Sequence, residues 1–193
     1  VELPKIDKER IRKVVDNCQN GYIGPDEMYE MLDAAGIAQK QIRVVDQKQQ
    51  AIDFANEVGY PLVMTVVGPV HKSDVGGVTL NVRDIETVAS EFDRLMAIKD
   101  TYAVEMYPML DGTEVYIGAI RDDKFGHQVF FGLGGIFIEV LKDVQSAFAP
   151  ITAAEAKDML SNLRGYKILQ GVRGQEPVNI DIYAEQIARV SAL

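Results

Sequence analysis

The feature that most constrains the fold is an apolar run from Tyr60 to Val67, interrupted only by Thr65. A half-exposed strand alternates apolar and polar side chains, whereas a strand covered on both faces does not. The run therefore predicts a strand that is buried on both faces. Amphipathic helices are expected before and after it, at 46–58 and 84–98. These elements predict mixed α/β structure up to about residue 100.

Capping residues predict where the helices begin. Asp7, Asp46 and Asp84 are expected N-caps, and Thr152 with Glu155 three residues later forms a capping box. The expected helices are 7–19, 25–36, 46–58, 84–98, 152–163 and 180–192, and the expected strands of the first part are 42–45, 60–67 and 78–82.

The pattern of expected elements changes after residue 100, where alternating helices and strands give way to a succession of short strands. Short aromatic and β-branched runs at 102–107, 114–121 and 128–133 are separated by turn residues, which predicts a β-meander. Periodicity leaves open whether Ile136–Leu141 is strand or helix. These two patterns of elements predict an α+β (α/β) fold with two lobes and a cleft between them. We expect an N-terminal helix or linker at 1–20, a first lobe at 21–100 and a second lobe at 101–193.

Charge and cysteine content exclude several function classes. The formal net charge is −9, which argues against nucleic acid or an anionic membrane as the main partner. Cys18 is the single cysteine, so no intrachain disulfide can form, and two histidines argue against a zinc site. The sequence contains neither an apolar run of membrane-spanning length nor a signal peptide, so a cytoplasmic location is expected.

The first motif that could carry chemistry is the loop His71–Gly77, which reads HKSDVGG. Glycines let a backbone approach an anion, Lys72 supplies a positive charge, and Ser73 supplies a hydroxyl donor. An imidazole such as that of His71 can accept a phosphoryl group covalently. The alternative is a solvated loop with ordinary turn glycines.

A second motif lies within Phe125–Asp143, where GLGG interrupts an apolar run and Glu139 precedes Asp143 by four residues. It predicts either a phosphate loop with Mg²⁺ ligands or a tight β-bulge with surface acids. A third segment, Glu105–Pro108 followed by Glu114, fits either an adenine-binding edge or an ordinary strand end and hairpin.

Three segments, 59–82, 121–144 and 164–181, together resemble the ATP-grasp domain of ADP-forming acyl-CoA synthetases. That family, within the succinyl-CoA synthetase-like superfamily, includes acetate–CoA ligase (ADP-forming). The resemblance implies a two-lobed ATP-grasp fold that holds the nucleotide between its lobes. It also implies ATP or ADP and Mg²⁺ as cofactors, a CoA-binding subunit or domains as partner, and a phosphohistidine relay. The reaction interconverts acyl-CoA, ADP and phosphate with the acid, CoA and ATP. The alternative is a non-catalytic nucleotide-sensing or scaffolding module, for example within a protein acetyltransferase.

The resemblance also implies roles for single residues. His71 would receive or pass the phosphoryl group, and Glu139 and Asp143 would lie at the metal. Residues implied at the nucleotide are Thr65, Lys72, Ser73, Asp74, Gly76, Gly77, Glu105, Met106, Tyr107, Glu114, Gly134 and Gly135.

Two departures from the family pattern bear on activity. Thr65 stands where the family usually has a phosphate-pairing lysine, and losing such a cation is expected to weaken ATP binding by roughly 1–3 kcal/mol. The sequence also ends at Leu193, before the strand that supplies the family's further metal ligands. We therefore expect a C-terminally incomplete fold that does not turn over alone, with residues 1–20 outside the resemblance.

Overall fold

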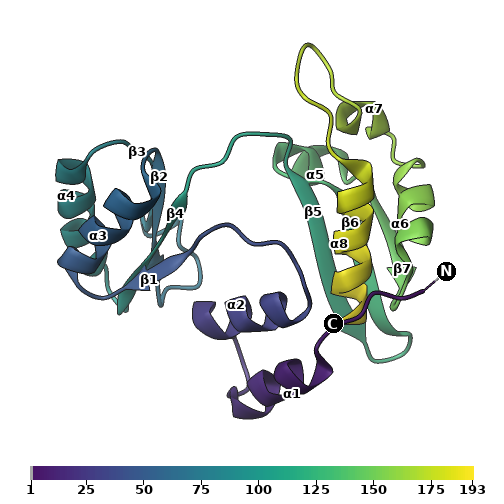
Figure 1. Cartoon of the computed structure of the whole chain (residues 1–193), viewed down its shortest axis with the longest axis horizontal. Coiled ribbons are helices and arrows are strands. Elements are labelled where there is room, and N and C mark those ends of the chain that lie inside the picture. Colours follow the sequence, from purple (N-terminus) through teal and green to yellow (C-terminus); the bar gives the residue numbers. More distant parts are fainter. Residues whose placement is uncertain (1) are drawn as a thin grey trace. The chain divides into compact units, whose positions relative to one another are not determined.

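The computed structural model describes residues 2–193, apart from the side chains of Ile136 and Glu139 (Figure 1). The chain forms two compact units. The first-sheet unit contains Gly21–Tyr29 and Gln39–Asp111. The second-sheet unit contains the segment up to Asn20, Glu30–Ala38 and Gly112–Leu193. In the described residues, no helix is long and apolar enough to cross a membrane.

The first-sheet unit is an antiparallel sheet with two helices. Its strand order is β1-β4-β2-β3. The elements are β1 (Arg43–Val45), α3 (Lys48–Val58), β2 (Leu62–Val67), β3 (Val78–Val82), α4 (Ile85–Met96) and β4 (Ala103–Pro108). Leu62, Met64 and Val66 of β2 pack in a core with residues of α3 and α4. Every residue of β2 is buried, which confirms the prediction of a strand buried on both faces.

The second-sheet unit has a three-stranded antiparallel sheet of order β5-β6-β7. Its sheet consists of β5 (Val115–Asp122), β6 (Gly126–Leu133) and β7 (Val144–Phe148), and its helices are α5 (Ile136–Leu141), α6 (Ala153–Leu160), α7 (Tyr166–Leu169) and α8 (Ile180–Ala192). Val129, Phe131 and Leu133 of β6 pack in a core with residues of α6 and α8. Helix α1 (Lys8–Asn17) belongs to this unit, and the unit boundary falls within α2 (Pro25–Ala34).

Most predicted helix starts are confirmed. The side chains of Asp7, Asp84 and Thr152 each accept a hydrogen bond from an amide of the first turn, and Glu155 completes the capping box with Thr152. Asp46 is wrong as an N-cap, because Gln47 holds that position, and the amides of Asp46 and Gln47 both donate to the Gln50 side chain. A carboxylate one residue too early does not reach the amides of the first turn.

The predicted meander of 102–107, 114–121 and 128–133 is wrong in its first strand. β4 joins the first sheet between β1 and β2, and β5, β6 and β7 form the meander. Val104 and Met106 of β4 are buried in the first core, so burial determined the strand's partner. The ambiguous segment 136–141 is helical.

Candidate functional site

The loop after β2 is a closed turn whose glycines are fixed by packing. The Gly77 amide donates to the carbonyl of Lys72 over 2.7 Å. A Cβ on Gly77 would collide with Val66 and with that carbonyl, and Gly76 has a positive φ of 66°. Both glycines are therefore required by the turn itself, before any ligand is considered.

Arg94 of α4 anchors the end of this loop. Its guanidinium donates to the Gly76 carbonyl over 2.8 Å and also to Glu91 and to the Thr79 hydroxyl. The hydrogen bond from Arg94 lowers the pKa of the Glu91 carboxyl. The sequence did not indicate this contact, because a charged residue on an amphipathic helix is usually solvated.

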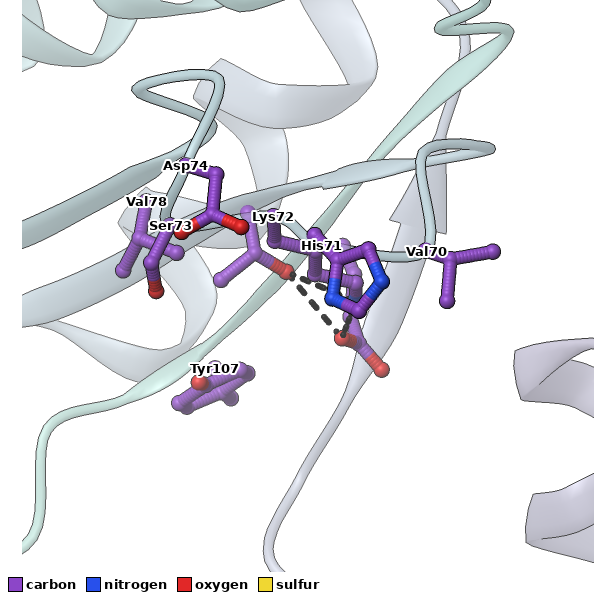
Figure 2. A pocket seen from close by; sticks show the side chains of 9 residues that line it. Val70, His71, Lys72, Ser73, Asp74, Val78 and Tyr107 are labelled. Atoms are coloured by element: carbon purple, nitrogen blue, oxygen red, sulfur yellow. Dashed lines mark hydrogen bonds and ion pairs between the residues drawn. The ribbon is translucent and has the colours of Figure 1, made fainter.

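The loop borders a pocket of about 430 Å³, shown in Figure 2. The lining residues are Thr65, Val70, His71, Lys72, Ser73, Asp74, Val78, Glu105 and Tyr107. Six of these nine are residues that the resemblance implies at a nucleotide, and a seventh, His71, is the implied phosphoryl acceptor. The seven come from β2, the loop and β4. The structure thus brings together groups up to 42 positions apart in the chain (65 to 107).

A three-way contact lies at the base of the pocket. The Lys72 ammonium is 3.3 Å from the Glu105 carboxylate and 3.4 Å from the Thr65 hydroxyl, and that hydroxyl donates to Glu105 over 3.2 Å. The dashed lines of Figure 2 mark these contacts. The side chains of Lys72 and Glu105 are 34% and 17% exposed, so the ion pair is only partly screened by water. Lys72 is therefore held beside the strand position where the expected lysine is absent.

Tyr107 forms an aromatic part of the pocket lining. The ammonium of Lys40 lies 3.2 Å from the centre of its ring, a cation–π contact that the sequence did not indicate. Burial, and then the Glu105 charge, raise the pKa of Tyr107. Burial lowers the pKa of Lys40. A lysine in a loop before a strand gives no sequence signal of such a partner.

Met106 lies apart from the pocket although its two neighbours line it. Its side chain is fully buried in the core on the other face of β4. β4 is hydrogen-bonded to strands on both edges, so its main-chain groups serve the ladders. The side chains of Glu105 and Tyr107, rather than the β4 backbone, are available to a ligand.

In the second-sheet unit, Glu114, Gly134 and Gly135 line a separate cavity of about 720 Å³, together with residues that include Arg173. The Gly134 amide donates to the Glu114 carbonyl over 2.9 Å. A Cβ on Gly135, whose φ is 54°, would meet the Glu114 carboxylate. The close approach of residues 114–115 explains both glycines.

Asp143 is a buried carboxylate with two main-chain partners. It is 5% exposed and accepts hydrogen bonds from the amides of Arg164 (3.0 Å) and Gly165 (2.6 Å), one at each oxygen. These contacts fix the turn before α7. Glu139, the other implied metal ligand, has a side chain outside the described residues. Among the described side chains, no three His, Cys, Asp or Glu residues gather to hold a metal ion.

Comparison with known proteins agrees with this fold. Residues 15–193 match the family model of the ATP-grasp domain. The beta subunit of acetate–CoA ligase (ADP-forming) I from Pyrococcus furiosus is 39% identical over 196 residues, which cover 95% of this chain and 84% of that subunit. Acetate–CoA ligase (ADP-forming) I of Archaeoglobus fulgidus is 36% identical, and the match covers 97% of this chain and 29% of that protein.

Solved structures show the same similarity. Acetyl-coenzyme A synthetase 1 of Ca. Korarchaeum cryptofilum, in complex with coenzyme A and Ca-AMPCP, superposes with a TM-score of 0.84 at 31% identity, covering 96% of this chain and 85% of that chain. Another structure of that enzyme holds coenzyme A and Mg-AMPPCP, with its phosphohistidine segment pointing towards the nucleotide binding site (TM-score 0.78, 32% identity, covering 96% and 84%).

The chain belongs to the ATP-grasp domain family, in the branch that forms the ATP-grasp portion of ADP-forming acyl-CoA synthetases. The family inferred from the three sequence segments is thereby confirmed. The chain spans most of the Pyrococcus furiosus beta subunit but less than a third of the Archaeoglobus fulgidus ligase.

Proposed function

We propose that this chain binds ADP or ATP and carries the phosphoryl-transfer part of an ADP-forming acyl-CoA synthetase. In the complete reaction acyl-CoA, ADP and phosphate would give the acid, CoA and ATP, with a CoA-binding subunit or domains as partner. The observation that supports this most is the pocket of the first-sheet unit, which gathers His71, Lys72, Ser73 and Glu105. The nucleotide analogues held by the related synthetase point the same way.

In this proposal Lys72 and the Ser73 hydroxyl bind phosphate oxygens. A lysine ammonium has three donors, and contacts with Glu105 and Thr65 leave donor capacity towards the pocket. Phosphoryl transfer needs little more from a protein than positioning and stabilisation of charge. A cation already held at the pocket base meets that need, and the neutral Thr65 leaves Lys72 as the ammonium among the residues that line it.

His71 is the proposed phosphoryl acceptor. It is exposed and lines the same pocket as Lys72. A neutral imidazole nitrogen would attack the terminal phosphorus of ATP, so that an N–P bond forms and the P–O bond to ADP breaks. The other ring nitrogen then releases its proton, and the reverse sequence makes ATP.

Asp143, the implied metal ligand whose side chain is described, already has main-chain partners. Both oxygens of Asp143 accept main-chain hydrogen bonds, and no cluster of ligands lies near it in the described part. We therefore assign no step to a protein-held metal. The roles of Glu114, Gly134, Gly135, Glu139 and Asp143 at a nucleotide or metal stay predictions.

Two measurements test this function. Calorimetric titration with ADP should show binding that Lys72→Met weakens by about tenfold or more, the scale of a lost charged hydrogen bond. Lys99→Met, an exposed lysine of the same unit outside the pocket, is the matched control and should bind as wild type. Incubation with [γ-³²P]ATP and Mg²⁺ should give an acid-labile label that His71→Ala lacks.

A second candidate function is a nucleotide-sensing module without phosphoryl transfer. The neutral, buried Thr65 favours it, because one fewer cation faces the phosphates. This function predicts ADP binding that depends on Lys72 but no labelled histidine, even in the presence of a CoA-binding partner. A label that requires His71 would rule it out.

A further inference from the structure

The first-sheet pocket has a polar end and an aromatic end on one face of the sheet. Glu105 and Tyr107 are two residues apart on β4, so their side chains lie on the same face about 7 Å apart. Their cross-strand neighbours on β2 are Thr65 and Val63. The face therefore runs from the Lys72–Glu105 pair to the Tyr107 ring, a span that one nucleotide can cover.

Lys40 covers one side of that ring. Its ammonium lies 3.2 Å from the ring centre, yet Lys40 does not line the pocket, whereas Tyr107 does. A base that enters the pocket would stack on the ring face opposite the ammonium. An ammonium on one face of a tyrosine holds the ring in place and draws π-electron density towards itself. The opposite face then repels the π cloud of a stacked base less.

We propose that Lys40 is a positioning residue for nucleotide recognition, which holds the Tyr107 ring as the stacking surface for the purine base while Lys72 binds the phosphates. This inference rests on the proposed nucleotide function and assigns the base to the Tyr107 end of the pocket. Glu105 is the charged group between the two ends, and its carboxylate also attracts the Lys40 ammonium.

A neighbouring recess offers a competing place for the base. It has a volume of about 390 Å³, shares Val70, Lys72 and Glu105 with the first pocket, and is bordered by Tyr22 and Tyr102. Both tyrosines are largely exposed, at 87% and 62%, and neither has a cation on its ring in the described residues. The held ring of Tyr107 is the better-organised surface, because less freedom is lost when a base stacks on it.

The test is calorimetric titration of the chain with ADP and, separately, with inorganic pyrophosphate, which lacks the base. Lys40→Met keeps the length of the side chain but removes its charge. It should weaken ADP binding by about three- to tenfold and leave pyrophosphate binding unchanged. Lys40→Arg keeps a cation beside the ring and should restore most of the ADP affinity that Lys40→Met loses. Tyr107→Leu should weaken ADP binding, and adding Lys40→Met to it should have no further effect.

Four results would overturn the inference. One is equal weakening of ADP and pyrophosphate in Lys40→Met, which would indicate only a long-range charge effect. The second is ADP binding unchanged in Lys40→Met while the wild type binds ADP, which leaves the proposed function standing. The third is a loss of ADP affinity in Tyr102→Leu but not in Tyr107→Leu, which would place the base in the neighbouring recess. Absence of ADP binding by the wild type would overturn the proposed function as well.

Discussion

In the first-sheet unit, His71, Ser73 and Asp74 stand exposed at a pocket, whereas in the second-sheet unit the Asp143 carboxylate is buried against two main-chain amides. Both groups come from segments that combine glycines with charged residues. The difference shows that glycines combined with charged residues do not by themselves predict a binding site. Polar atoms are available to a ligand only when they lack hydrogen-bond partners within the folded chain.

One glycine from each unit shows the same difference. Gly77 and Gly135 both lack room for a Cβ, but their surroundings differ. Gly77 closes a turn that presents side chains to a pocket, while Gly135 allows a close approach to the Glu114 carboxylate. We make five predictions from this contrast, four on anchored groups of the second-sheet unit and one on Lys72 of the first-sheet unit.

The largest expected effect is the loss of Asp143. Asp143→Ala leaves two buried amides without an acceptor, so the free energy of unfolding should fall by about 2–4 kcal/mol. Urea unfolding followed by far-ultraviolet circular dichroism measures this. Asp123→Ala removes an exposed carboxylate on a turn and should change stability by less than about 0.5 kcal/mol. A stable Asp143→Ala that loses Mg²⁺ affinity would instead support a metal-binding role.

The next effect concerns Tyr183, whose hydroxyl joins α8 to the second sheet. It accepts from the Gly132 amide over 3.0 Å and has the carbonyls of Gly132 and Tyr116 as acceptors at 2.7 Å. Tyr183→Phe should lower the free energy of unfolding by about 1–3 kcal/mol.

The same residue gives a pH prediction. Burial raises the pKa of the Tyr183 phenol far above its ordinary value, so the folded state keeps this proton more tightly than the unfolded state does. The contribution is complete below the ordinary tyrosine pKa of about 10 and is lost as pH rises above it. Wild type should therefore lose stability more steeply than Tyr183→Phe above about pH 10. Equal slopes would contradict the buried environment.

A smaller effect is expected at Gly135. Gly135→Ala adds a Cβ at a positive φ and against the Glu114 carboxylate, which should cost about 1–2 kcal/mol. In a Glu114→Ala background part of this cost should disappear, because the colliding carboxylate is gone. A double-mutant cycle by urea unfolding measures the coupling, and strict additivity would show that Glu114 does not constrain the glycine.

The smallest effect on stability is expected at Lys72. Its partly exposed ion pair with Glu105 has a separation of 3.3 Å, so Lys72→Met should change the free energy of unfolding by less than about 1 kcal/mol. The same variant should show the large loss of ADP affinity described above. A large loss of stability would place Lys72 among the anchored groups and remove the contrast between the units.

Local signals predicted local features well. Asp84 and Thr152 cap their helices because capping depends on residues within one turn, and β2 is buried because its own composition required it. The loop from His71 could be singled out for the same reason. The family resemblance added residues on β4 that no local pattern connects to that loop.

Features that depend on distant partners could not be predicted. The strand partners of β4 follow from the core that Val104 and Met106 join. The contact of Lys40 with Tyr107 and that of Arg94 with the loop each join positions far apart in the chain. The hydrogen bonds that Asp143 accepts come from amides more than twenty residues away, at positions 164 and 165.

The most direct test of the central claim is a ¹H–¹⁵N correlation spectrum of the chain titrated with Mg-ADP. Mg-ADP should shift the amide signals of His71, Lys72 and Ser73, which border the first-sheet pocket. The amide signals of Arg164 and Gly165 should not shift, because Asp143 remains bonded to them. Shifts of the Arg164 and Gly165 amide signals without shifts in the His71 loop would contradict nucleotide binding at the first-sheet pocket. They would show that Asp143 leaves its amides for a ligand.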